Sequence, residues 1–192
     1  MAFVKSFKDS SLLLKVTACI LIINMALAWV SFVTASWGDG YGDDATKTKK
    51  IKKGYGLWKE CSDDEIESGC VNLTGWNLQW YRAVQAFSIF GFMSVNFCFL
   101  SVLLLMFNPS CHKRKSLHLW VAVIGLWSAI SYTVSIIVFG VGFDSSFTDS
   151  SLPNQYLEYG WALAIVVAVF QVFVGLIMII ESRSIDAKFM DL

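Results

Sequence analysis

The chain has few charged residues and almost no proline. Of its 192 residues, 16% are charged, 56% are hydrophobic and only two are proline, and the mean hydropathy is +0.58. This composition is too apolar for an ordinary soluble domain of this size. The 15 basic and 15 acidic residues leave no net charge, so nothing in the composition points to a nucleic-acid partner.

Charge is missing above all from four long apolar segments. Residues 83–107, 119–143 and 161–180 carry no charged side chain, and residues 12–36 carry only Lys15. A helix of about 20 apolar residues crosses the roughly 30 Å hydrocarbon layer of a membrane. We therefore predict a single domain, residues 1–192, with membrane spans at residues 12–36, 83–107, 119–141 and 161–180.

Acids and bases are absent from the hydrocarbon region of these spans, which argues against a proton relay or a secondary transporter. Three amides, Asn24, Asn96 and Gln171, are polar residues at membrane depth. An unpaired amide at membrane depth is costly, so we expect these side chains to face neighbouring helices and form hydrogen bonds with them.

Histidine is as scarce as proline, since only His112 and His118 occur. Both flank a basic segment, and no Ser/His/Asp set, metal-ligand cluster or phosphate-binding loop accompanies them. The sequence therefore predicts no enzyme, no metal site, no cofactor and no small-molecule substrate.

The basic segment also predicts the orientation in the membrane. It lies in the short link 108–118 and contains no acid, so the positive-inside tendency places the link in the cytoplasm. Both termini, 1–11 and 181–192, are then cytoplasmic, and the connecting segments 37–82 and 142–160 are extracellular. The lysine run between Lys47 and Lys53 would favour the inverted topology, which stays as an alternative.

The first span has a second interpretation. Lys5 and Lys8 followed by an apolar run that ends in Ala26-Leu27-Ala28 are similar to a secretory signal with a cleavage site. The apolar run continues through Trp29 to Ala35, however, and this length favours an uncleaved transmembrane helix.

The segment 37–82 carries signs of an oxidising, extracellular environment. Cys61 and Cys70 can close a small ring, and such a bond persists only outside the cytosol. Asn72 begins an Asn-x-Thr triplet, which accepts a glycan on that same side. We expect the glycine-rich opening, Gly38 to Asp44, to be a flexible turn. Alternating apolar and aromatic residues between Tyr55 and Trp80 predict a small antiparallel sheet on top of the bundle.

Several residues of this segment follow one another in a specific order: Trp37, Gly56-Leu57-Trp58, Cys61, Cys70 and Arg82. The set resembles the claudin signature in its full order, and Glu158 with Gly160 extends the likeness. The resemblance implies a mainly α membrane fold, a left-handed bundle of four transmembrane helices with a small extracellular antiparallel sheet. It also implies a Cys61–Cys70 disulfide. The segment Val84 to Phe87 is similar to the peripheral myelin and epithelial membrane proteins of the same superfamily.

The resemblance implies a plasma-membrane protein of cell–cell junctions. Such a protein associates with itself or with related claudins, within one membrane and across the cell gap, and forms or regulates a paracellular barrier or ion-selective pathway. Candidate contacts with the opposite cell are Phe147 and Leu152, and the candidate cation-selecting carboxylates are Asp63, Asp64, Glu65 and Glu67. The alternatives are an adhesion or membrane-organising protein and an auxiliary subunit of a channel or receptor.

Two further candidates lie on the expected cytoplasmic side. Cys111 stands beside the basic cluster and is a candidate for palmitoylation. The terminal Met190-Asp191-Leu192 could add as a strand to a PDZ scaffold, with Leu192 in its pocket.

Overall fold

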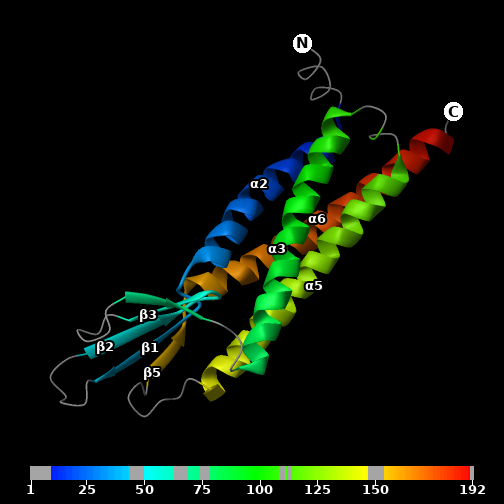
Figure 1. The fold of residues 1–192 in the computed structure, drawn as a ribbon. Helices are drawn as coiled ribbons and strands as arrows, with labels where there is room; N and C mark the ends of the chain where they lie inside the picture. The colour runs from blue at the N-terminus through cyan, green and yellow to red at the C-terminus, as the bar shows by residue number, and fades with distance from the viewer. Residues whose placement is uncertain are drawn as a thin grey trace.

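The computed structural model describes residues 10–43, 50–62, 69–73, 78–108, 111, 114–146 and 154–190. Within them lie four long helices, with a small sheet at one end (Figure 1). The helices are α2 (Leu12–Val33), α3 (Gln79–Phe107), α5 (Lys115–Ser146) and α6 (Tyr159–Met190). The strands are β1 (Gly38–Asp43), β2 (Lys50–Tyr55), β3 (Lys59–Ser62), β4 (Gly69–Asn72) and β5 (Asn154–Leu157).

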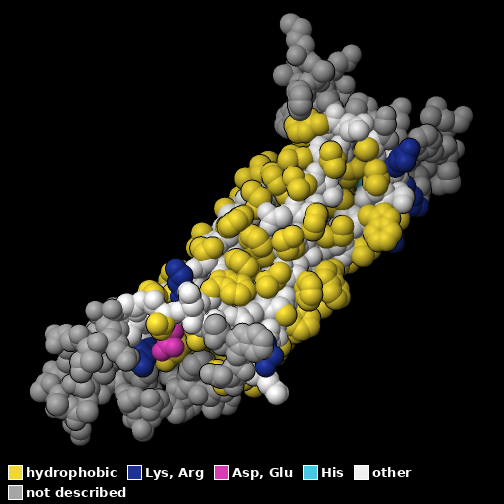
Figure 2. Space-filling model, in the orientation of Figure 1, with side chains coloured by type: hydrophobic (Ala, Val, Ile, Leu, Met, Phe, Trp, Pro, Cys, Tyr) yellow, Lys and Arg dark blue, Asp and Glu magenta, His cyan; other side chains and the backbone are white. Residues whose placement is uncertain are grey.

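All four helices are long and apolar enough to cross a membrane. α2 has 22 residues and α6 has 32, which correspond to roughly 33 Å and 48 Å of helix. Figure 2 shows hydrophobic side chains spread over the helical shaft, with Lys and Arg near its two ends. The predicted fold class, a mainly helical membrane protein with a small antiparallel sheet, is confirmed.

Local sequence explains where the helices begin and end. The Ser11 hydroxyl accepts a hydrogen bond of 3.1 Å from the backbone N–H of Leu14, which caps the start of α2. α3 ends at Phe107 because Asn108 precedes a proline and adopts an extended conformation. On the sheet side, α3 and α5 extend beyond the apolar segments, to Gln79 and Ser146.

The helices form a bundle in which α5 lies between α3 and α6, and α2 contacts both α3 and α6. Small polar residues join α3 to α5 in the interior. The hydroxyls of Ser88 and Ser135 are 2.6 Å apart, and the Ser128 hydroxyl donates to the Gly91 carbonyl over 3.0 Å. Glycine allows the closest approaches, because a Cβ at Gly91 would overlap the ring of Tyr132.

The sheet combines both segments that connect the helices at this end. Its strand order is β4-β3-β2-β1-β5, and all pairs are antiparallel. β5 comes from the second connecting segment and pairs with β1, with Gly38 opposite Leu157. The expectation of a flexible turn at Gly38 to Asp44 was wrong, since Gly38–Asp43 is β1. Trp80 lies in α3 and not in a strand, while Trp76 is outside the described residues.

Two glycines in α5 give a matched test of this packing. A Cβ at Gly142 would overlap the indole ring of Trp80, whereas one at Gly140 would meet its nearest neighbours at an ordinary 4.0 Å. We expect Gly142→Ala to lower the free energy of unfolding by about 1–3 kcal/mol through overpacking. Gly140→Ala should leave the free energy of unfolding unchanged or raise it slightly, because alanine has a higher helix propensity than glycine.

The measurement is unfolding of the purified protein in detergent, followed by far-UV circular dichroism. Equal stability of the two alanine variants would contradict the close contact between α5 and Trp80.

Candidate functional site at the junction of sheet and bundle

Trp37 connects three parts of the molecule. Its side chain is fully buried, and the indole Nε1–H donates to the Ser31 carbonyl near the end of α2 over 2.7 Å. Its backbone N–H donates to the carbonyl of Tyr55 at the end of β2, and its carbonyl accepts from the N–H of Glu158 just after β5. The ring also contacts Phe139 of α5 edge-on. Trp37 therefore ties the first helix to both parts of the sheet.

The Gly56-Leu57-Trp58 triplet forms the turn between β2 and β3 and presses against the bundle. A Cβ at Gly56 would overlap the backbone of Thr34 and Ala35, so only glycine fits this approach. Leu57 is fully buried, and the indole of Trp58 packs against Phe32 with ring centres 5.1 Å apart. The motif thus docks the sheet onto the end of α2.

Two polar side chains of α3 hold the backbone of this triplet. The Tyr81 hydroxyl donates to the Gly56 carbonyl, and the Gln85 side-chain amide donates to the Leu57 carbonyl over 2.8 Å. Each bond satisfies a turn carbonyl that burial would otherwise leave unpaired. The same Gln85 nitrogen lies 3.4 Å from the carbonyl of Leu73, the residue that follows β4.

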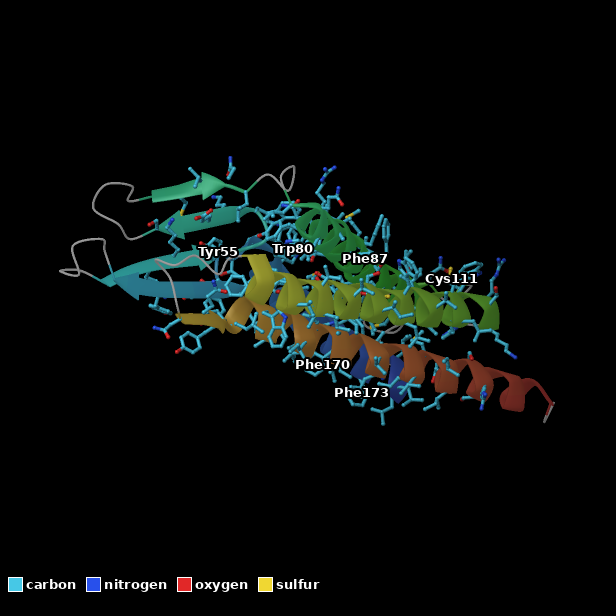
Figure 3. The ribbon with its side chains drawn as sticks, turned by 90° about the horizontal axis from the view of Figure 1, so that it is seen from below. Tyr55, Trp80, Phe87, Cys111, Phe170 and Phe173 are labelled. Carbon is cyan, nitrogen blue, oxygen red and sulfur yellow. A yellow bond between two sulfur atoms is a disulfide. The ribbon has the colours of Figure 1, made fainter. Side chains whose placement is uncertain are left out.

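The start of α6 is joined to the same region. The Gly160 carbonyl accepts a 2.7 Å hydrogen bond from the Ser31 hydroxyl, and its N–H donates to the Ser36 carbonyl. A Cβ at Gly160 would meet Thr34, Ser36 and Trp37 within 2.6–2.8 Å. Figure 3 shows the labelled Tyr55 and Trp80 in this junction, with Cys111 far along the bundle.

The disulfide Cys61–Cys70 is confirmed, and it joins β3 to the outer strand β4. The two cysteines stand directly opposite each other in the strand register. β4 pairs with β3 alone among the described strands, and each of its four residues is exposed. The disulfide therefore holds a strand that has little buried surface of its own.

A charged pair crosses the middle of the sheet. The Asp39 side chain is only 2% exposed and accepts a 2.7 Å ion-paired hydrogen bond from Lys52. The Tyr41 hydroxyl donates to the same carboxylate oxygen over 3.3 Å, and the Lys52 ammonium lies 5.3 Å from the centre of the Tyr41 ring. The hydrogen bond with Asp39 raises the pKa of Lys52 above its ordinary value.

The other predicted site residues are scattered. Asn72 ends β4 and is exposed, and Arg82 is exposed in the first turn of α3. Cys111 lies beyond α3 at the opposite end of the bundle, where it lines an apolar cavity of about 190 Å³ with Leu104 and Trp120. Several candidates lie outside the described residues: Asp63, Asp64, Glu65, Glu67, Phe147, Leu152, Asp191 and Leu192. Met190 is the last residue of α6, and its side chain is not among those described.

Sequence reasoning missed part of the junction. Ser31 and Tyr81 each make a contact that positions the signature residues, and the Asp39–Lys52 pair was not foreseen. The available signal was weak: a small polar residue near the end of an apolar run. Among the described residues, no group of three or more His, Cys, Asp and Glu side chains could hold a metal ion.

Four apolar helices and a disulfide-bonded sheet built from both connecting segments define a four-span membrane protein with a sheet at one end of the bundle. The chain belongs to the PMP-22/EMP/MP20/Claudin family, because the model of that family matches residues 10–178. A comparison with curated proteins gives no match. Family membership also favours a structural membrane protein over an enzyme.

Removal of the disulfide should loosen β4 first. We expect the double substitution Cys61→Ala and Cys70→Ala to lower the free energy of unfolding by about 2–3 kcal/mol, as loop-closure entropy predicts for a ring of this size. Cys19→Ala, on the exposed face of α2, is the control and should change nothing. Thermal unfolding in detergent with and without reductant measures the effect, and an unchanged melting temperature in the double variant would refute it.

The Asp39–Lys52 pair should respond asymmetrically to substitution. Lys52→Met leaves a buried carboxylate without its cation and should cost about 1–2 kcal/mol, a value reduced by the partial exposure of Lys52. Asp39→Asn should cost less, and adding it to Lys52→Met should recover part of the loss.

The pH dependence of this pair has a definite sign. Because the pKa of Lys52 is higher in the folded state, the stabilisation is complete below about pH 10 and is lost only as the pH rises through the folded-state pKa. Unfolding of the single and double variants in detergent at pH 7 and above pH 10 tests both statements. Equal costs for the two single variants would contradict the asymmetry.

Proposed function

We propose that this protein is a cell-contact protein of the claudin type, located at junctions in the plasma membrane. It associates with itself or with related claudins within one membrane and across the gap to the next cell, and forms or regulates a paracellular barrier or ion-selective pathway. The observation that carries the proposal is the sheet, which joins both connecting segments and leaves β4 and β5 as its outer strands.

The outer strands have the properties of an association surface. A strand at the edge of a sheet offers backbone N–H and C=O groups to another chain. Val71 of β4 and Tyr156 of β5 are 67% and 58% exposed, so each edge also presents an apolar side chain. A protomer with two such edges can pair with a neighbour on either side and extend into a row.

The same arrangement supports the proposed orientation in the membrane. α2 begins and α6 ends at the end of the bundle opposite the sheet (Figure 1). Arg114 precedes α5 and Lys115 is its first residue at that end, which the positive-inside tendency assigns to the cytoplasm. Both termini are then cytoplasmic and the sheet is extracellular. Palmitoylation of Cys111 and capture of Leu192 by a PDZ scaffold are compatible proposals for this side.

A second function is favoured by Asn72. It is exposed at the end of the edge strand β4, so a glycan there would cover this edge and stop the addition of a neighbour. Such a protein would resemble the adhesive or membrane-organising members of the superfamily, without rows of protomers. An auxiliary subunit of a channel or receptor is the remaining alternative.

The test is expression in epithelial monolayers, with transepithelial resistance and the sodium chloride dilution potential as readouts. We expect enrichment at cell contacts together with a change in resistance or selectivity. The substitution Asn72→Gln separates the two functions, since it should enhance junctional rows if the glycan blocks β4. Surface delivery without either electrical change, in both the parent chain and Asn72→Gln, would reject the junctional role.

Ion preference is tested in the same cells. The candidate carboxylates should favour cations, so replacing Asp63, Asp64 and Glu65 together by lysine should shift the dilution potential towards anions. Surface biotinylation controls for delivery of the variant. An unchanged dilution potential with normal delivery would refute the role of these acids.

A further inference from the structure

Two amide side chains are buried in the bundle without hydrogen-bond partners. Asn24 of α2 and Gln171 of α6 are both 0% exposed, and neither the oxygen nor the nitrogen of either carboxamide has a partner within the described part of the chain. The expected bonds to neighbouring helices are therefore not formed. Asn96 differs from both, because its amide donates to the Phe92 carbonyl of its own helix over 2.8 Å.

Such a pair needs an explanation. The great majority of buried polar atoms in folded proteins bond to protein or to ordered water. Neither lipid nor an apolar core can replace those bonds. Burial of two carboxamides without hydrogen-bond partners would therefore carry a large cost in folding free energy. A polar partner that lies between the helices would remove this penalty.

The two amides occupy the same layer of the bundle. The buried apolar residues form two separate clusters, one near the sheet and one near the opposite end. The residues on either side of the amides belong to different clusters: Leu21 and Ala28 on α2, Ala168 and Val174 on α6. Asn24 and Gln171 thus lie where the apolar core is interrupted on both helices.

The two side chains lie at similar depth in the bundle. The Ser31–Gly160 hydrogen bond sets the relative depth of α2 and α6. From it, Asn24 is roughly 10 Å along α2 and Gln171 roughly 16 Å along α6, a difference of about one helical turn. Side chains lean towards the N-terminus of their helix, and the two helices run in opposite directions. Asn24 therefore leans away from the sheet and Gln171 leans towards it.

Gln171 also faces α5. A Cβ at Gly125 of α5 would lie 3.4 Å from the Gln171 Oε1 atom, so this polar atom lies against a glycine of the neighbouring helix. Ser128, one turn further along α5, is also small and buried. One more turn along, the buried Tyr132 hydroxyl has no hydrogen-bond partner among the described residues and leans towards the same layer.

We propose that Asn24 and Gln171 bind ordered water in the interior of the bundle. Each carboxamide offers two N–H donors and an oxygen acceptor, and a buried water typically forms two to four hydrogen bonds. Water that bridges the two side chains gives each of them a hydrogen-bond partner and links α2 to α6 through polar contacts at the layer where the apolar core is broken.

The test is nuclear magnetic resonance of the full chain in lipid bilayers, with ¹⁵N in the Asn and Gln side chains and ¹³C in the Leu and Val methyl groups. Polarisation transferred from water should appear in the carboxamide signals of Asn24 and Gln171 and not in the methyl signals of Leu21 and Val174. Absence of transfer to both carboxamides would overturn the proposal, and so would a direct coupling that shows the two amides bonded to each other.

Variants test whether the water bridges the pair. Gln171→Met keeps the length of the side chain and removes its amide, so most of the water transfer to Asn24 should be lost. Asn96→Leu is the matched control and should leave both signals unchanged, because Asn96 bonds within its own helix. Full retention of transfer at Asn24 in the folded Gln171→Met protein would refute a bridge. The measurement on the unaltered chain decides the proposal if that variant does not fold.

Discussion

The buried position of Trp37 is the constraint on which the packing of the sheet against the helical bundle depends. The residue follows the end of α2, and its hydrogen bonds reach back to Ser31, sideways to the end of β2 and across to Glu158. A tryptophan satisfies this position because its large ring fills the space against Phe139 while its single N–H finds a carbonyl. The sheet consequently leaves the bundle in one defined direction, although the two segments that form it are far apart in the chain.

Glycine completes the junction by allowing backbones to touch. Gly56 brings the turn between β2 and β3 against Thr34 and Ala35, and Gly160 brings the start of α6 against Thr34, Ser36 and Trp37. Tyr81 and Gln85 of α3 then bond to the carbonyls of the turn. The end of α2 and two side chains of α3 thus hold this turn of the sheet, so contacts made by the sheet with other molecules would be transmitted to the bundle directly. In the proposed pairing through strand edges, such a preorganised edge would lose little conformational entropy on association.

Much of this architecture could be predicted from the sequence, and the reasons are physical. A membrane span requires a long uncharged segment, and such segments are visible in the composition. The disulfide and the turn triplet were recognised from their order. β1 was not predicted, because Gly38, Gly40 and Gly42 have no side chains and so give no alternation of apolar and polar residues. The segment forms a strand through its pairing with β2 and β5. The Asp39–Lys52 pair is likewise invisible in the sequence, since it depends on the register of those strands.

The prediction for the intramembrane amides failed for a related reason. Burial of Asn24 and Gln171 follows from the cost of exposing an amide to lipid, but the identity of the partner depends on helix depth and rotation, which the sequence does not encode locally. Both amides lie at the break between two apolar clusters, one attached to the sheet and one at the opposite end. An apolar pair at these positions would join the clusters into one core. Retaining polar groups there instead restricts the depth at which α2 and α6 can pack, because a shift of one turn would place each amide against apolar side chains. The polar layer therefore acts on the same two helices whose ends are joined at Ser31 and Gly160, and it restricts their register from inside the membrane.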